Sequence, residues 1–80
     1  MKVNYDKETD SLYIDLNERK SFDSKEIEDG LVLDFDEKGQ IVGIDIQYAS
    51  TRLDLKNIEI NALPINKTNY KTESYVLRED

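Results

Sequence analysis

The sequence predicts a mainly β protein, a small antiparallel β-meander sheet of four to six strands with one short helix. Two observations predict this fold class. Apolar and polar side chains alternate over most of the first sixty residues, which is the pattern of half-buried strands. Short polar stretches containing Gly, Asp and Lys separate the alternating runs, as hairpin turns do.

The length of 80 residues allows one domain, which we place at residues 1–64. A domain of this size buries only about 60% of the surface of its unfolded chain, so self-association is a common supplement to its stability. Residues 65–80 form a polar C-terminal extension. Its "ESYVLRE" segment is either a late strand or a mobile tail, and the sequence leaves both open.

The first part of the chain predicts a hairpin followed by an edge strand. "KVNYD" and "SLYIDLN" alternate and are separated by the polar "DKETD". The next stretch is highly charged, with Phe22 and Ile27 as its only large apolar side chains. "SKEIEDG" is either a short edge strand or a loop that ends at Gly30, and we favour the edge strand.

A second hairpin is predicted over "LVLDFDEKGQIVGIDIQY". Gly39 in its turn can adopt a positive φ, and Gly43 inside its second strand indicates a bulge or a close backbone approach. The alternation predicts one apolar face, made of Leu12, Ile14, Leu16, Leu33, Phe35, Val42, Ile44 and Ile46. One short helix cannot cover that face, so the sheet either curls on itself or packs against a second copy of the chain. We favour the homodimer.

After the second hairpin, "ASTRLDLKN" predicts a turn or two of helix that runs to about Lys56. Ser50 or Thr51 is the expected N-cap, because a side-chain oxygen there can accept a bond from a free N–H group of the first turn. Alternation then returns at Ile58 and Ile60 and ends at Pro64.

Charge and composition narrow the function classes. Eighteen acidic residues against eleven basic ones give a net charge of −7, which disfavours nucleic acid as a partner and favours a basic protein. The absence of cysteine is typical of cytoplasmic proteins. We see no signal peptide and no apolar run near the ~20 residues that span a bilayer, so we expect no membrane association.

The spacing of Asp34, Asp36, Gly39 and Asp45 partly matches a calcium-binding loop. Lys38, however, places a cation where that loop needs an oxygen ligand, and the flanking segments alternate as strands. We therefore favour a simple hairpin turn. Asp34, Asp36 and Asp45 are only weak candidates for a metal site, and we assign no metal and no cofactor.

No catalytic residues are predicted. The chain has no histidine and no cysteine, its serines lack a nucleophile motif, and it has no glycine-rich phosphate loop. We expect a non-enzymatic protein, with a minimal hydrolase as the least favoured alternative. Tyr13 lies on the polar face of its strand near acidic residues, so it is either a protein-contact residue or an ordinary exposed side chain.

The motifs together resemble a known family of short prokaryotic proteins, the domain of unknown function 2283 family. The resemblance rests on Tyr5-Asp6, Asp10, Leu12-Tyr13-Ile14, Gly30, "LDFD", Gly39, "IVGIDI" and Ala49-Ser50. Phe35 replaces the usual tyrosine of this pattern. The family implies no established activity and no catalytic residues, although some members resemble small proteins encoded beside toxin-like partners.

The sequence therefore predicts an acidic protein-interaction module. The family resemblance implies that its role is antitoxin-like. The alternative function is a small-molecule or divalent-metal-binding domain that uses the carboxylates of the second hairpin.

Overall fold

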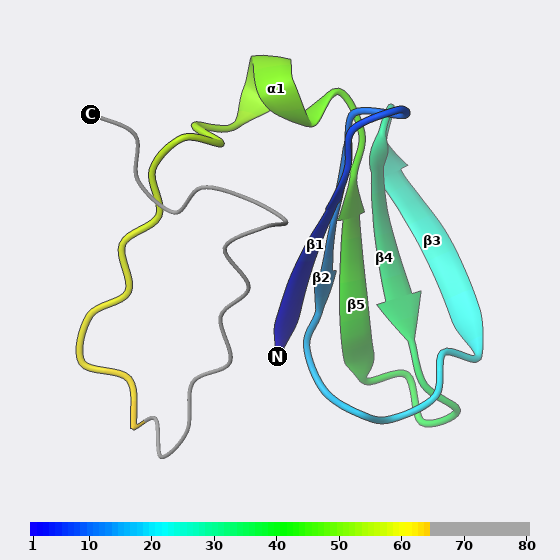
Figure 1. Ribbon diagram of the computed structural model, residues 1–80. Coiled ribbons are helices and arrows are strands. Elements are labelled where there is room, and N and C mark those ends of the chain that lie inside the picture. The colour runs from blue at the N-terminus through cyan, green and yellow to red at the C-terminus, as the bar shows by residue number, and fades with distance from the viewer. Residues whose placement is uncertain (65–80) are drawn as a thin grey trace.

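The computed structural model describes residues 1–64, which form one open antiparallel sheet and one short helix (Figure 1). The elements are β1 Lys2–Asp6, β2 Ser11–Asp15, β3 Asp23–Glu28, β4 Leu31–Phe35, β5 Ile41–Ile46 and α1 Ala49–Arg52. The mainly β fold class is confirmed, and so is the strand over the charged "SKEIEDG" segment. The expected late strand or tail in residues 65–80 lies outside the described residues.

The strand order differs from the expected meander, because it runs β1-β2-β5-β4-β3. The connection between β2 and β3 crosses to the far edge, and β5 returns to pair with both β2 and β4. This order places β5, the strand "IVGIDI", at the centre of the sheet. It leaves the charged β3, "DSKEIE", at an edge, where charge discourages pairing with other chains.

Left-handed backbone conformations close the turns of both predicted hairpins. Gly39 has φ 78° in the β4–β5 turn, and Gly30 has φ 79° between β3 and β4. The glycine expected in the second hairpin therefore does adopt a positive φ. Asp10, which ends the β1–β2 turn, also has a positive φ of 54°, a conformation that aspartate tolerates better than most residues.

The pairing register separates the sheet into two faces. One row runs Tyr5, Leu12, Ile46 and Leu31 across the strands. The next runs from Val3 to Leu33 through two isoleucines. The apolar face predicted from alternation is thus present. Its side chains on β2 and β4 are only half-buried, and Val42 and Ala49 are the only buried apolar residues among residues 1–64.

Gly43 shows both features that its place inside a strand predicts. The β4–β5 register shifts by one residue, since Asp34 pairs with Gly43 but Phe35 pairs with Ile41. This bulge leaves Val42 without a direct partner on β4. The close approach is made by Tyr13 of β2, the strand on the other side of β5, because a Cβ at Gly43 would overlap the Tyr13 hydroxyl.

The helix is shorter than expected and is capped differently. It covers only Ala49–Arg52, its N-cap is Tyr48 with φ 56°, and that residue provides no side-chain cap. The expected cap at Ser50 or Thr51 is therefore wrong. Asp10 of the β1–β2 turn accepts from the free N–H groups instead. The Ala49 N–H donates to the backbone oxygen of Asp10, and the Ser50 N–H donates to its carboxylate.

Residues 53–64 run away from the sheet without forming a strand (Figure 1). The alternation at Ile58 and Ile60 leaves both side chains exposed, by 46% and 58%. In the described part of the chain, no helix has the length and apolar character needed to cross a bilayer.

Candidate functional site

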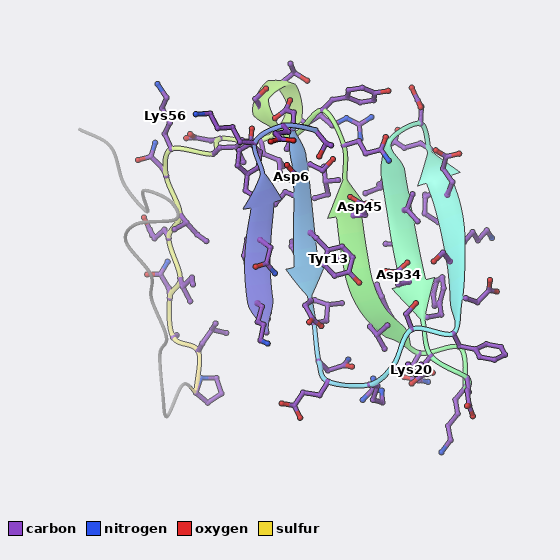
Figure 2. All side chains as sticks on the ribbon, turned by 45° about the vertical axis from the view of Figure 1, so that its right-hand side comes forward. Asp6, Tyr13, Lys20, Asp34, Asp45 and Lys56 are labelled. Carbon is purple, nitrogen blue, oxygen red and sulfur yellow. The ribbon has the colours of Figure 1, made fainter. Side chains whose placement is uncertain are left out.

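Tyr13 and two of the three candidate carboxylates lie together on the polar face of the sheet (Figure 2). Tyr13 on β2 pairs with Asp45 on β5, and Asp34 on β4 pairs with Gly43 on β5. The polar face therefore brings Tyr13, the predicted contact residue, close to Asp34 and Asp45, two of the predicted metal candidates. The three residues come from three neighbouring strands.

The Tyr13 side chain crosses the central strand to reach Asp34. Its hydroxyl donates a hydrogen bond of 2.7 Å to Asp34 Oδ2. The ring can take this path only because Gly43 has no side chain where the hydroxyl and ring pass. The interaction thus links β2 to β4 over the backbone of β5, and it leaves Tyr13 half-buried rather than exposed as expected.

The second oxygen of Asp34 is also occupied. The Ser24 hydroxyl on the edge strand β3 donates a 2.6 Å hydrogen bond to Asp34 Oδ1, as expected for residues directly opposite each other in the β3–β4 register. Asp34 therefore accepts from hydroxyls on both sides, and the network spans four strands. Ser24, Asp34 and Tyr13 thus form one hydrogen-bonded chain across the polar face.

Acidic neighbours shape the electrostatics of this face. The hydrogen bond to Asp34, followed by burial and the negative charges of Asp34, Asp15 and Asp45, raises the pKa of Tyr13 to about 12. The hydroxyl therefore stays neutral, and remains a donor, to a higher pH than an ordinary tyrosine. In contrast to that of Asp34, the carboxylates of Asp15 and Asp45 make no hydrogen bond or ion pair within residues 1–64.

Asp36, the third metal candidate, does not join this group. It follows β4, where its Oδ1 accepts the backbone N–H groups of Lys38 and Gln40, both at 2.9 Å. Its Oδ2 accepts from Arg19 Nε at 2.8 Å. These donors, with the Gln40 N–H first among them, lower the pKa of Asp36. The carboxylate therefore organises the hairpin turn, which agrees with the preference for a hairpin over a calcium loop.

The structure offers nothing that favours the metal-binding alternative. Among residues 1–64, no three carboxylates gather closely enough to hold a metal ion. Asp34 and Asp36 already have internal donors on both oxygens.

A second hydrogen-bonded group, centred on one carboxylate and not predicted as a site from the sequence, joins the β1–β2 turn to α1. Asp10 accepts hydrogen bonds from the hydroxyls of Tyr5 and Ser50, each at 2.7 Å. These bonds, that from Ser50 first, lower the pKa of Asp10. The bond to Asp10 raises the pKa of Tyr5. The available signal was that Tyr5, Asp10 and Ser50 all belong to the quoted family motif.

A shallow hollow of about 280 Å³ lies at the other end of the sheet, lined by Lys20, Ser21, Phe22 and Glu37. None of the predicted site residues lines it. The Phe22 side chain is 72% exposed there, so the hollow is open to solvent.

Comparison with known families identifies the chain. The family model described as "Protein of unknown function (DUF2283)" matches residues 2–50. The chain belongs to this family. No curated protein matches the chain, and no solved structure matches it either. The resemblance inferred from the sequence motifs is thus confirmed.

For this DUF2283 protein, the motif residues have structural roles. Gly39 and Gly30 adopt positive φ in turns, and a Cβ at Gly30 would press against the Tyr48 ring. Gly43 provides the path for the Tyr13 ring, and Asp10 supports α1. The pattern that defines the resemblance therefore accounts for how the sheet is built. The family description assigns it no function.

Proposed function

We propose that this protein is an acidic, non-enzymatic protein-interaction module of the cytoplasm, which works as a homodimer and binds a basic protein. An antitoxin-like role toward a cationic partner, implied by the family resemblance, is one form of this function. The observation that carries the proposal is the chemistry of the polar face. Tyr13 is held in place at its centre, with two unpaired carboxylates beside it.

The charge on this face is strongly one-sided. The register places five carboxylates on it, those of Asp6, Asp15, Glu26, Asp34 and Asp45. Among residues 1–64, the register places one cation there, Lys2 opposite Asp15. Such a surface attracts a cationic partner and speeds its association.

Tyr13 supplies an apolar contact within the acidic surface. Tyrosine is enriched in protein interfaces because its ring buries area while its hydroxyl stays hydrogen-bonded. Here the hydroxyl is already bonded to Asp34, so little side-chain entropy remains to be lost on binding. An arginine or lysine of the partner can therefore meet a fixed ring, with Asp15 and Asp45 beside it.

The test is an affinity pull-down from native cytosol at low and at high salt, followed by binding of the recovered protein to purified variants. A basic partner should be retained at low salt and released at high salt, because exposed charges are screened. The variant Asp15→Asn/Asp45→Asn should no longer retain the basic partner at low salt. The control Glu18→Gln/Glu37→Gln removes the same charge from loops outside the strands and should retain it.

Two results would contradict the proposal. One is binding that the two double variants weaken equally, since that would reflect net charge rather than the polar face. The other is retention that does not depend on salt. Circular dichroism of each variant shows whether the fold is intact before binding is compared.

A further inference from the structure

The face opposite Tyr13 has no covering layer in the described part of the chain. Its apolar side chains on β2 and β4 are half-buried at best, and no large side chain in residues 1–64 is fully buried. A sheet with one apolar face reaches stability by packing that face against another layer.

The rest of this chain is a poor candidate for that layer. Residues 56–64 lie apart from the strands in both views (Figures 1 and 2) and are all exposed, Leu63 by 52%, whereas Leu53 and Leu55 directly after α1 are half-buried. The segment 65–80 is mostly polar and contains five large apolar side chains, Ile65, Tyr70, Tyr75, Val76 and Leu77. That is fewer than the eight residues predicted for the apolar face alone.

The sheet edges are unsuited to joining another chain. Every residue of β1 and β3 is exposed. β3 carries a bulge between Glu26 and Glu28 and a charge at Lys25, and β1 has Lys2 and Asp6 at its ends. Bulges and charges of this kind prevent edge-to-edge pairing, so the apolar face is the remaining surface for association.

We propose that a second copy of this chain packs its apolar face against this one, so that the homodimer is a two-layer β-sandwich. The charge distribution favours this arrangement. The acidic polar faces then point outward from opposite sides of the dimer. Stacked sheets are about 10 Å apart, so the charged side chains of the two outer faces are farther apart than the Debye length of about 8 Å. Stacking through the polar faces would instead bring like charges together.

The available area is close to what a specific dimer needs. Five strands at about 4.8 Å spacing and about 5–6 residues each give a face of roughly 24 by 18 Å. Two such faces bury about 900 Å² before the relief of the side chains is added, just below the lower bound of about 1,000 Å² for a specific interface. The rim on β3 carries both signs of charge, since Asp23 and Lys25 pair with Phe35 and Leu33 of the apolar face.

This inference deepens the proposed function, because it defines the surface that forms the proposed dimer. It also leaves the polar faces of both copies open to a partner. Its test uses the purified protein alone. A failure here is therefore distinguishable from a failure to bind a basic protein.

The experiment combines mass measurement with site-specific cross-linking of the full chain. Sedimentation velocity over a wide concentration range should show a dimer in equilibrium with monomer. Because the chain has no cysteine, single thiols can be introduced at chosen places. Ile44→Cys lies in the middle of the apolar face, and its neighbour Asp45→Cys lies on the polar face. A bifunctional maleimide that spans about 10 Å should link only the first into a dimer.

A second pair of variants keeps the test decisive if one protein does not fold. Leu33→Cys on β4 faces the apolar side and should cross-link, whereas the adjacent Val32→Cys faces the polar side and should not. A full chain that stays monomeric at every concentration would overturn the proposal. So would a dimer in which the polar-face thiols cross-link as well as the apolar-face thiols.

Discussion

Gly43→Ala is the substitution that most directly tests how the polar face is built. The Cβ that it adds would overlap the hydroxyl and the ring of Tyr13. The backbone itself can accept alanine, since Gly43 is not among the residues with positive φ. The side chain must therefore swing away, which breaks its 2.7 Å hydrogen bond to Asp34.

The expected magnitude follows from two opposing effects. Losing a hydrogen bond to a charged group costs about 1.5–3 kcal/mol, and the lower end applies because Tyr13 is only half-buried. Replacing glycine by alanine in a strand recovers about 0.5–1 kcal/mol of backbone entropy. Gly43→Ala should therefore lower the free energy of unfolding by about 1 kcal/mol in the wild-type background.

The effect of Gly43→Ala on the free energy of unfolding should change sign when the Tyr13 ring is absent. In the background of Tyr13→Ala nothing opposes the new Cβ, so Gly43→Ala should stabilise the protein by about 0.5–1 kcal/mol. The difference between the two backgrounds, a coupling of about 1.5–2 kcal/mol, isolates the Tyr13–Gly43 contact. Urea unfolding followed by far-UV circular dichroism measures it, at one protein concentration because self-association shifts the apparent stability.

An equal effect of Gly43→Ala in both backgrounds would refute this reasoning. It would mean that the ring does not lie over the glycine in solution. Tyr13→Phe serves as the control, because it removes the hydrogen bond but keeps the ring over Gly43. In that variant the new Cβ still displaces the ring but no hydrogen bond remains to be lost, so the effect of Gly43→Ala should lie between its effects in the other two backgrounds.

Three further predictions concern pH and the turns. The raised pKa of Tyr13, about 12, means that its contribution to stability is complete below its unfolded pKa of about 10 and is lost as pH rises from there toward 12. Tyr13→Phe should reduce this loss in urea unfolding at alkaline pH. The pKa of Asp10 is lowered, so its contribution is present above its unfolded pKa and is lost as pH falls through the folded value. Asp10→Asn, which keeps a residue that tolerates positive φ, should flatten the acid limb of the stability curve. Gly39→Ala should cost about 1 kcal/mol by chemical unfolding, because Gly39 has φ 78° and no neighbour within contact distance, so backbone strain is the sole penalty. An unchanged alkaline profile, an unchanged acid limb or a neutral Gly39→Ala would each contradict the corresponding argument.

Local patterns were sufficient to predict the strands and their faces. Side chains alternate with a period of two in a strand, so "SLYIDLN" and "LVLDFD" show their apolar side directly. The edge position of β3 was equally accessible, since its charges are tolerated only where one side of the strand faces solvent. The glycine inside β5 indicated a bulge or a close approach, and the structure has both.

Features that depend on contacts distant in sequence were not predictable in this way. The order of the strands depends on which pairing buries the most apolar surface. Hairpin patterns alone do not distinguish a sheet in which β5 pairs with β2 from a meander, in which β3 would pair with β2. The cap of α1 comes from Asp10, forty residues earlier, so a search for Ser50 or Thr51 as the local N-cap failed. Tyr13 was expected to be exposed because its partner Asp34 is 21 residues away.

Five aspartates of the polar face and the turns divide into two groups with different consequences for experiments. Asp10, Asp34 and Asp36 accept hydrogen bonds from the protein itself, so neutralising them removes internal bonds and lowers stability. Asp15 and Asp45 have no such bonds within residues 1–64, so neutralising them leaves the fold unchanged. Reduced partner binding by a variant of the first group can therefore result from unfolding. Only the second group reports on recognition, which is why the binding test uses Asp15 and Asp45.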